Sequence, residues 1–204
     1  MASVLKLTRV PLFFLLTCMA LASCKKGPSA SKERDARPRI RTSGYAELLQ
    51  NIEDRKLRKE VEAFGEGGVE RPLIVQEGSP EDLIKAASAF MGTPHRMGGL
   101  SRKGIDCSGL LVVAFGKLGV QVPHNSEQLA RLGRIVPGRD ELKRGDLVFF
   151  IRTYRTSNFI THAGIYLGQG DFIHTSSSRG VMVSSLDDPH YWQPKYIFGT
   201  RVFD

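Results

Sequence analysis

The sequence predicts an α+β domain in which helices come first and an antiparallel sheet of about five or six strands follows. Apolar residues recur at helical spacing through residues 45–132. Short runs rich in β-branched and aromatic residues, separated by glycine, asparagine, serine and proline, fill residues 147–203. Helices followed by strands are typical of α+β domains, whereas alternation of the two would indicate a parallel sheet.

The first 23 residues are interpreted as an export signal that is removed. Lys6 and Arg9 precede an apolar stretch, residues 10–20, which is too short to span a membrane as a helix. The tetrapeptide Leu21-Ala22-Ser23-Cys24 resembles the bacterial lipobox, whose cysteine is acylated, with palmitate among its acyl chains, and becomes the mature N-terminus. The resemblance implies a lipoprotein anchored through Cys24 on the exported side of a membrane, facing the periplasm if the cell has an outer membrane.

Residues 24–42 are predicted to be a basic tether. Seven Lys or Arg residues and two acidic residues lie in this stretch, together with two prolines and two serines. This composition is typical of a solvated, disordered spacer, and it is also compatible with attraction to anionic lipid head groups. The absence of aromatic residues among the basic ones argues against a nucleic-acid partner.

The next segment, residues 43–78, is predicted to be helical and then a linker. Helical spacing connects Tyr45 to Ile52, and Val61 with Phe64 continues the pattern on a highly charged surface helix that is either docked or free. Glycines at 65, 67 and 68 end it. Residues 71–78 are expected to be a linker or a short strand.

The main domain is predicted to cover residues 79–204. Ser79 and Asp82 have the spacing of a capping box, and Pro80 fits the first helical position, so a helix should begin there. A short helix is expected after residue 125. Strands are expected at 147–151, 159–167, 171–175, 181–185 and 196–203.

Cys107 is predicted to begin a helix and to be a nucleophile. Asp106 stands at the N-cap position, an apolar stripe continues to Leu118, and Gly119 ends the helix. The helix dipole and a neighbouring histidine would lower the pKa of the thiol and favour a thiolate. The alternative is a buried cysteine with a packing role. Because the other two cysteines lie at positions 18 and 24, Cys107 would be the only free thiol left after processing, which favours chemistry.

His162 and His174 are the predicted partners of Cys107 among five histidines. They flank a hairpin whose loop is predicted to be Gly168-Gln169-Gly170. An odd loop pairs residue 164 with 174 and therefore places both imidazoles on one face of the sheet. One imidazole could then act on Cys107 while the second fixes the tautomer of the first.

Five motifs in order resemble the NlpC/P60 cysteine peptidases over residues 80–204. They are Gly92-Thr93-Pro94-His95-Arg96-Met97-Gly98-Gly99, Gly104-Ile105-Asp106-Cys107-Ser108-Gly109, Gly145-Asp146-Leu147-Val148-Phe149-Phe150, His162-Ala163-Gly164-Ile165-Tyr166-Leu167-Gly168 and Phe172-Ile173-His174. The resemblance implies a papain-like α+β core that hydrolyses amide bonds in peptidoglycan stem peptides, commonly beside or across diaminopimelate. It implies no cofactor and no metal, and we expect a monomer.

The resemblance also implies roles for individual residues. Cys107 matches the nucleophile, His162 the general base and acid, and His174 the residue that orients the base. His95 stands where the family often has a tyrosine, and His124 where an arginine is frequent. His95 and Ser108 are the candidates for oxyanion and substrate contacts. Two alternatives remain at this stage, which are a zinc site built from Cys107, His162 and His174, and a cell-wall binding lipoprotein without activity.

Overall fold

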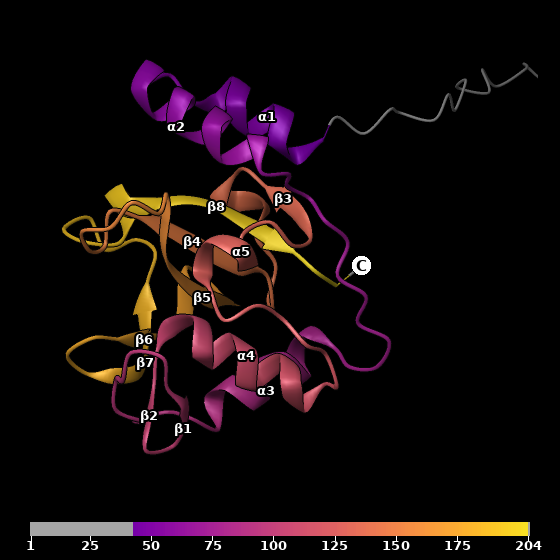
Figure 1. The fold of residues 1–204 in the computed structure, drawn as a ribbon, viewed down its shortest axis with the longest axis vertical. Coiled ribbons are helices and arrows are strands. Elements are labelled where there is room, and N and C mark those ends of the chain that lie inside the picture. The colour runs from indigo at the N-terminus through magenta and orange to yellow at the C-terminus, as the bar shows by residue number, and fades with distance from the viewer. Residues whose placement is uncertain (1–42, 204) are drawn as a thin grey trace, which may run out of the picture. The chain divides into compact units, whose positions relative to one another are not determined.

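A six-stranded antiparallel sheet is the central element of the computed structural model, which describes residues 43–203 (Figure 1). The order of its strands is β3-β8-β4-β5-β6-β7. Their bounds are β3 Arg134–Val136, β4 Leu147–Ile151, β5 Ile160–Gly168, β6 Asp171–Ser176, β7 Gly180–Ser185 and β8 Tyr196–Arg201. Two further short strands, β1 Leu100–Ser101 and β2 Gly104–Ile105, form a separate hairpin. The predicted α+β class is confirmed, and β3 is a strand that the sequence pattern did not predict.

Five α-helices accompany the sheet within residues 43–203. They are α1 Gly44–Asn51, α2 Arg55–Glu66, α3 Pro80–Ser88, α4 Cys107–Lys117 and α5 Ser126–Leu129, with 3₁₀ turns at Arg139–Glu141 and Gln193–Lys195. The capping box of Ser79 and Asp82 begins α3 as predicted. Helices α3 and α4 pack against each other, and α4 packs on β5 and β6 (Figure 1).

Strand β4 is buried on both faces, which gives the domain two apolar clusters. Leu147, Phe149 and Ile151 point to the larger cluster, which includes the apolar faces of α3 and α4. Val148 and Phe150 point to a smaller cluster that contains Trp192. Side chains alternate between the faces of a strand, so one continuous apolar run supplies both clusters.

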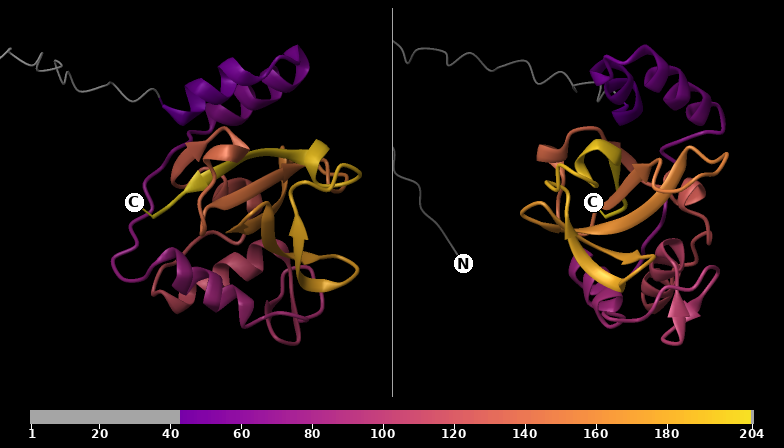
Figure 2. Two further views of the ribbon diagram at one scale, coloured as in Figure 1. Left: turned by 180° about the vertical axis from the view of Figure 1, so that it is seen from behind. Right: turned by 90° about the vertical axis from the view of Figure 1, so that its left-hand side faces the viewer.

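Residues 43–78 are docked on the domain. The sequence pattern suggested one helix continuing to Phe64, and this is wrong, because the chain turns after α1 and Asp54 caps a second helix, α2. Phe64 packs against Phe159 and Phe198, and its ring lies 4.3 Å from the guanidinium carbon of Arg131. Figure 2 shows both helices beside β3 and β8. Their apolar faces therefore belong to the core of the domain.

The hairpin of β5 and β6 has the predicted register but a different loop. Ile165 lies opposite Ile173, as the odd loop required, whereas the turn itself contains two residues and a bulge lies at Leu167–Gly168. Gln169 and Gly170 both have positive φ, 56° and 86°, which is typical of the tight turn that joins two twisted strands. Because the bulge adds one residue to β5, residues 165 and 173 pair as they would with a three-residue loop.

The predicted signal peptide 1–23, the lipidation site Cys24 and the tether 24–42 lie outside the described residues. In the range 43–203 we find no helix that is both long and apolar enough to cross a membrane.

Candidate active site

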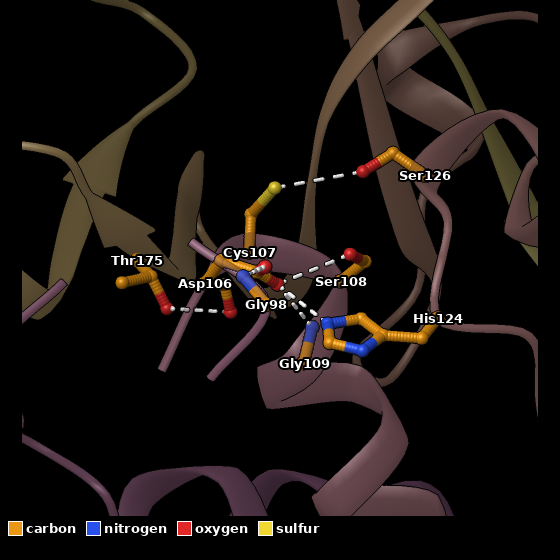
Figure 3. A network of polar contacts seen from close by, with 8 residues as sticks. All are labelled: Gly98, Asp106, Cys107, Ser108, Gly109, His124, Ser126 and Thr175. Atoms are coloured by element: carbon orange, nitrogen blue, oxygen red, sulfur yellow. Dashed lines mark hydrogen bonds and ion pairs between the residues drawn. The ribbon is translucent and has the colours of Figure 1, made fainter. Parts of the chain in front are cut away.

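Asp106 fixes the start of α4 through four contacts to one carboxylate (Figure 3). Its Oδ1 accepts hydrogen bonds from the backbone N–H of Gly109, 2.7 Å away, and from the hydroxyl of Ser108, and it lies 2.9 Å from Nε2 of His124. Its Oδ2 accepts from the N–H of Gly98 at 2.6 Å. Burial raises the pKa of this carboxyl, but the hydrogen bonds outweigh that effect and hold the pKa below its ordinary value. The carboxylate therefore ties the helix, the preceding loop and His124 together.

Cys107 is the first residue of α4 and is half-buried. Its Sγ lies 3.5 Å from the hydroxyl oxygen of Ser126, and this contact, together with the nearby backbone N–H groups of Ala163 and Ser108, acts to lower the pKa of the thiol. Burial nevertheless raises the pKa of the thiol above 9.0, and the charge of Asp106 adds to this. The expectation of a lowered pKa is therefore wrong for this state, because burial outweighs the helix terminus. The resting sulfur is a thiol that needs a base.

His162 and His174 face each other, as predicted for residues on one face of the sheet. Nε2 of His162 lies 3.0 Å from Nδ1 of His174, and Nε2 of His174 lies 2.9 Å from the hydroxyl oxygen of Ser184. Each neutral imidazole has one N–H and one lone pair. If His162 donates to His174, and His174 donates to Ser184, then Nδ1 of His162 keeps its lone pair. This assignment of protons leaves His162 able to act as a base.

Aromatic rings enclose the two histidines. The Trp192 ring centroid lies 5.2 Å from that of His162 and 4.7 Å from that of His174, and Phe172 stacks on His174. Burial lowers the pKa of His174 to about 4. Burial is the main cause that lowers the pKa of His162 well below 6.5, and repulsion from the charged forms of the neighbouring His174 and His95 adds to it. Both imidazoles are therefore neutral at neutral pH, so that His162 can accept a proton.

One cavity of about 820 Å³ brings the predicted site residues together. Cys107, His162 and His174 all line it, and so do His95 and His124, whereas His190 does not. Within residues 43–203 the side-chain hydrogen bond of the thiol goes to Ser126, so the predicted direct contact between thiol and imidazole is not formed in this state. Such contacts often tighten when substrate binds.

The two candidates for oxyanion contact occupy different positions. His95 lies on the wall of the cavity and is half-buried, held by a parallel bridge to Ile105. The hydroxyl of Ser108 is bonded to Asp106, so the group that Ser108 presents to Cys107 is its backbone N–H. The ring of His124 is hydrogen-bonded to the carboxylate of Asp106 and so belongs to the network that holds the start of α4.

The orientation of the two imidazoles argues against a zinc site built from Cys107, His162 and His174. His162 and His174 turn nitrogens toward each other, and the remaining nitrogen of His174 is bonded to Ser184. The two rings therefore do not converge with Cys107 on one point. No group of three or more His, Cys, Asp or Glu side chains in the described part of the chain is arranged to hold a metal ion.

Sequence reasoning did not identify Ser126, Ser184 and Trp192 as parts of the site. Ser126 contacts the thiol, Ser184 contacts the second histidine, and Trp192 covers both imidazoles. No short sequence motif indicates that these three residues belong to the site. Trp192 is the single tryptophan of the chain, which is the one signal that could have raised it as a candidate.

Comparison with known proteins gives consistent matches over this domain. Residues 92–201 match the model of the NlpC/P60 family. The probable endopeptidase NlpC of Escherichia coli strain K12 is 45% identical over 115 residues, which cover 56% of this chain and 72% of that protein. A murein DD-endopeptidase MepS/murein LD-carboxypeptidase of the same strain is 38% identical over 114 residues, or 55% and 57% of the two chains.

Two further matches agree. The probable endopeptidase NlpC homolog of Haemophilus influenzae is 38% identical over 121 residues, which cover 59% of this chain and 61% of the relative, so this chain spans about three fifths of that protein. The crystal structure of an NlpC/P60 family protein from Bacillus cereus superposes with a TM-score of 0.56 at 29% identity, covering 64% of this chain and 42% of the other. Because the family model matches more than half of the sequence and includes Cys107, His162 and His174, the chain belongs to the NlpC/P60 family.

Proposed function

We propose that this protein is a cysteine endopeptidase that hydrolyses amide bonds in the stem peptides or cross-links of peptidoglycan. The observation that carries the proposal is one cavity that holds a thiol at a helix N-terminus and a hydrogen-bonded pair of neutral histidines. The names of the relatives support the substrate, since one of them is a murein DD-endopeptidase. A catalytic cysteine with a histidine base needs neither cofactor nor metal.

The reaction follows from these groups. Nδ1 of His162 takes the thiol proton as the sulfur of Cys107 attacks the substrate carbonyl, and a thioester forms when the C–N bond breaks. The imidazolium of His162 gives its proton to the departing amine, and it is stabilised by His174, whose Nδ1 accepts the N–H from Nε2. The same imidazole then removes a proton from water, which attacks the thioester and releases the acid and the thiol.

The oxyanion needs donors near the sulfur. The side chain and backbone carbonyl of Asp106 already occupy the N–H groups of Gly109 and Leu110, so the first-turn donors that remain are the N–H groups of Cys107 and Ser108. His95, on the cavity wall, is the candidate for an additional donor. Loss of one oxyanion donor typically costs about 3 kcal/mol of transition-state stabilisation.

The test is digestion of purified muropeptides with product analysis by mass spectrometry. We expect the wild type to cut one amide bond in the stem peptide, and Cys107→Ser to leave the substrate intact. A chelator in the buffer should leave the rate unchanged, whereas loss of activity that added zinc restores would favour the metal alternative. Binding of muropeptides without hydrolysis by the wild type would support the cell-wall binding alternative instead.

We further propose that Cys24 carries the lipid that holds this protein to a membrane of the cell envelope, with the catalytic domain on the exported side. The tetrapeptide Leu21-Ala22-Ser23-Cys24 supports this. Cys24→Ala should release the protein from membranes or block its processing, because several acyl chains anchor a protein stably and none would be attached. Fractionation of cells in high salt measures the effect. A processed Cys24→Ala variant that still sediments fully with membranes would contradict the anchor.

A further inference from the structure

The turn between β6 and β7, residues 176–179, is held rigidly at the edge of the catalytic cavity. On one side, the buried hydroxyl of Thr175 donates to the carbonyl of Asp106 at 3.2 Å. On the other side, the N–H of Val181 donates to the carbonyl of Thr93 at 2.9 Å. Gly180 allows this close approach, because a Cβ at that position would lie 2.1 Å from the carbonyl oxygen of Thr93. The turn is therefore fixed relative to both the nucleophile and the loop that carries His95.

Arg179 projects from this turn and lines the cavity that contains Cys107. Its backbone N–H donates to the hydroxyl of Ser176, which closes the turn at 3.3 Å. Its side chain is exposed, and among the ion pairs of residues 43–203 there is none that engages its guanidinium. Arg179, His162 and His174 line the same cavity, and after burial the positive charge of Arg179 further lowers the pKa of His174.

The other charged groups of the cavity are either neutral or already engaged. The carboxylate of Asp106 accepts hydrogen bonds from several donors of its own loop and helix. His162 and His174 are neutral at pH 7 because burial lowers their pKa values. Asp188, the remaining acid on the wall, accepts a hydrogen bond from the backbone of His190. Arg179 thus offers the cavity a positive charge that no ion pair within residues 43–203 engages.

We propose that Arg179 binds a carboxylate of the substrate and so determines which stem peptides this enzyme accepts. The proposal rests on the proposed function, and it adds a specificity residue on an element that carries none of the reacting groups. A guanidinium presents a planar set of N–H donors that matches a carboxylate in a two-point contact. Stem peptides with diaminopimelate supply such carboxylates on either side of a scissile bond.

Three synthetic stem peptides test the inference. The first is the parent peptide, the second has its free carboxylate on the acyl side of the scissile bond replaced by a carboxamide, and the third has the same change on the amine side. The enzymes are the wild type, Arg179→Gln, which removes the charge, and Arg179→Lys, which keeps it. Arg155→Gln is the matched control. Arg155 is an exposed arginine in the 152–158 loop, and it does not itself line the catalytic cavity, although other residues of that loop do.

We expect Arg179→Gln to lower kcat/KM for the parent peptide by about tenfold to a hundredfold, mainly through KM, as is typical for loss of a charge-assisted hydrogen bond. The wild type should show a similar loss with one of the two carboxamide peptides, and for that peptide Arg179→Gln should cause no further loss. That peptide identifies the carboxylate. Arg179→Lys should retain part of the rate, and Arg155→Gln should match the wild type.

Two results would overturn the inference. In the first, Arg179→Gln hydrolyses the parent peptide at the wild-type kcat/KM. In the second, its loss is equally large for all three peptides, which would show that the arginine only supports the turn. Failure of the proposed function is distinguishable from both, because the wild type would then hydrolyse none of the peptides.

Discussion

His162→Ala is expected to lower the rate of peptide hydrolysis by about 10³- to 10⁴-fold, nearly as much as Cys107→Ala. The pKa of the buried thiol is raised, so Cys107 depends on a base to reach the thiolate. The same histidine has to protonate the departing amine, so it acts in both halves of every turnover. Steady-state hydrolysis of a purified muropeptide measures the effect, with thermal unfolding curves to show that each variant is folded.

The double variant Cys107→Ala with His162→Ala should be little worse than either single change, because the two residues act as one unit. His174 positions His162 and does not touch the substrate carbonyl in this scheme. His174→Gln keeps a hydrogen-bonding group near Nε2 of His162 and should retain more activity than His174→Ala. Wild-type rates in His162→Ala would assign the base to another histidine.

The pH profile of kcat/KM gives an independent check on the base. Hydrolysis needs a neutral His162, so the rate falls as the pH drops through the pKa of His162 in the folded enzyme. Because burial lowers that pKa well below 6.5, activity should persist below pH 6.5. On the alkaline side the rate should fall only when the thiol ionises, above its ordinary pKa of 9.0. An acid limb centred at or above pH 6.5 would contradict the enclosed histidine pair.

Asp106→Ala is expected to cost about 3 kcal/mol or more of unfolding free energy, because it removes the N-cap of α4 and leaves two buried donors and one part-buried donor without their acceptor. The donors are the N–H groups of Gly98 and Gly109 and the hydroxyl of Ser108. Hydrolysis should fall as well, since the carboxylate sets the position of the first turn and therefore of Cys107. Denaturant unfolding at pH 7, combined with kcat measurements, tests both effects.

Asp54→Ala is the matched control for this change. Asp54 is also an N-cap, of α2, but it is exposed, and within the described residues its side chain accepts only from the N–H of Leu57. We expect it to cost about 1 kcal/mol and to leave kcat unchanged. If Asp106→Ala proved no more destabilising than Asp54→Ala, the carboxylate would be an ordinary cap without a role in joining the loop to the helix.

The local sequence was sufficient for those features that depend on residues close together in the chain. The capping box at Ser79 and the N-cap at Asp106 are formed by residues within three positions of one another, so a short pattern predicts them. Alternating side chains and turn glycines predicted the five longer strands. They also predicted the register of β5 and β6, because a hairpin depends on its own short loop, even though the turn and bulge differ from the predicted loop.

The tertiary structure decided what depends on distant residues. The docking of α2 involves Arg131, whose side chain donates to the carbonyl of Phe64 from another part of the chain, and α1 packs on β3. The pKa of the Cys107 thiol is raised because the fold buries it. The local sequence pattern shows only that the residue lies at a helix N-terminus, which would lower the pKa. Trp192, in the connection between β7 and β8, covers both histidine rings, and no short-range pattern predicts this contact. Burial and long-range contacts are properties of the assembled chain, which is why the sequence could predict Cys107 as the nucleophile but not the protonation state of its thiol.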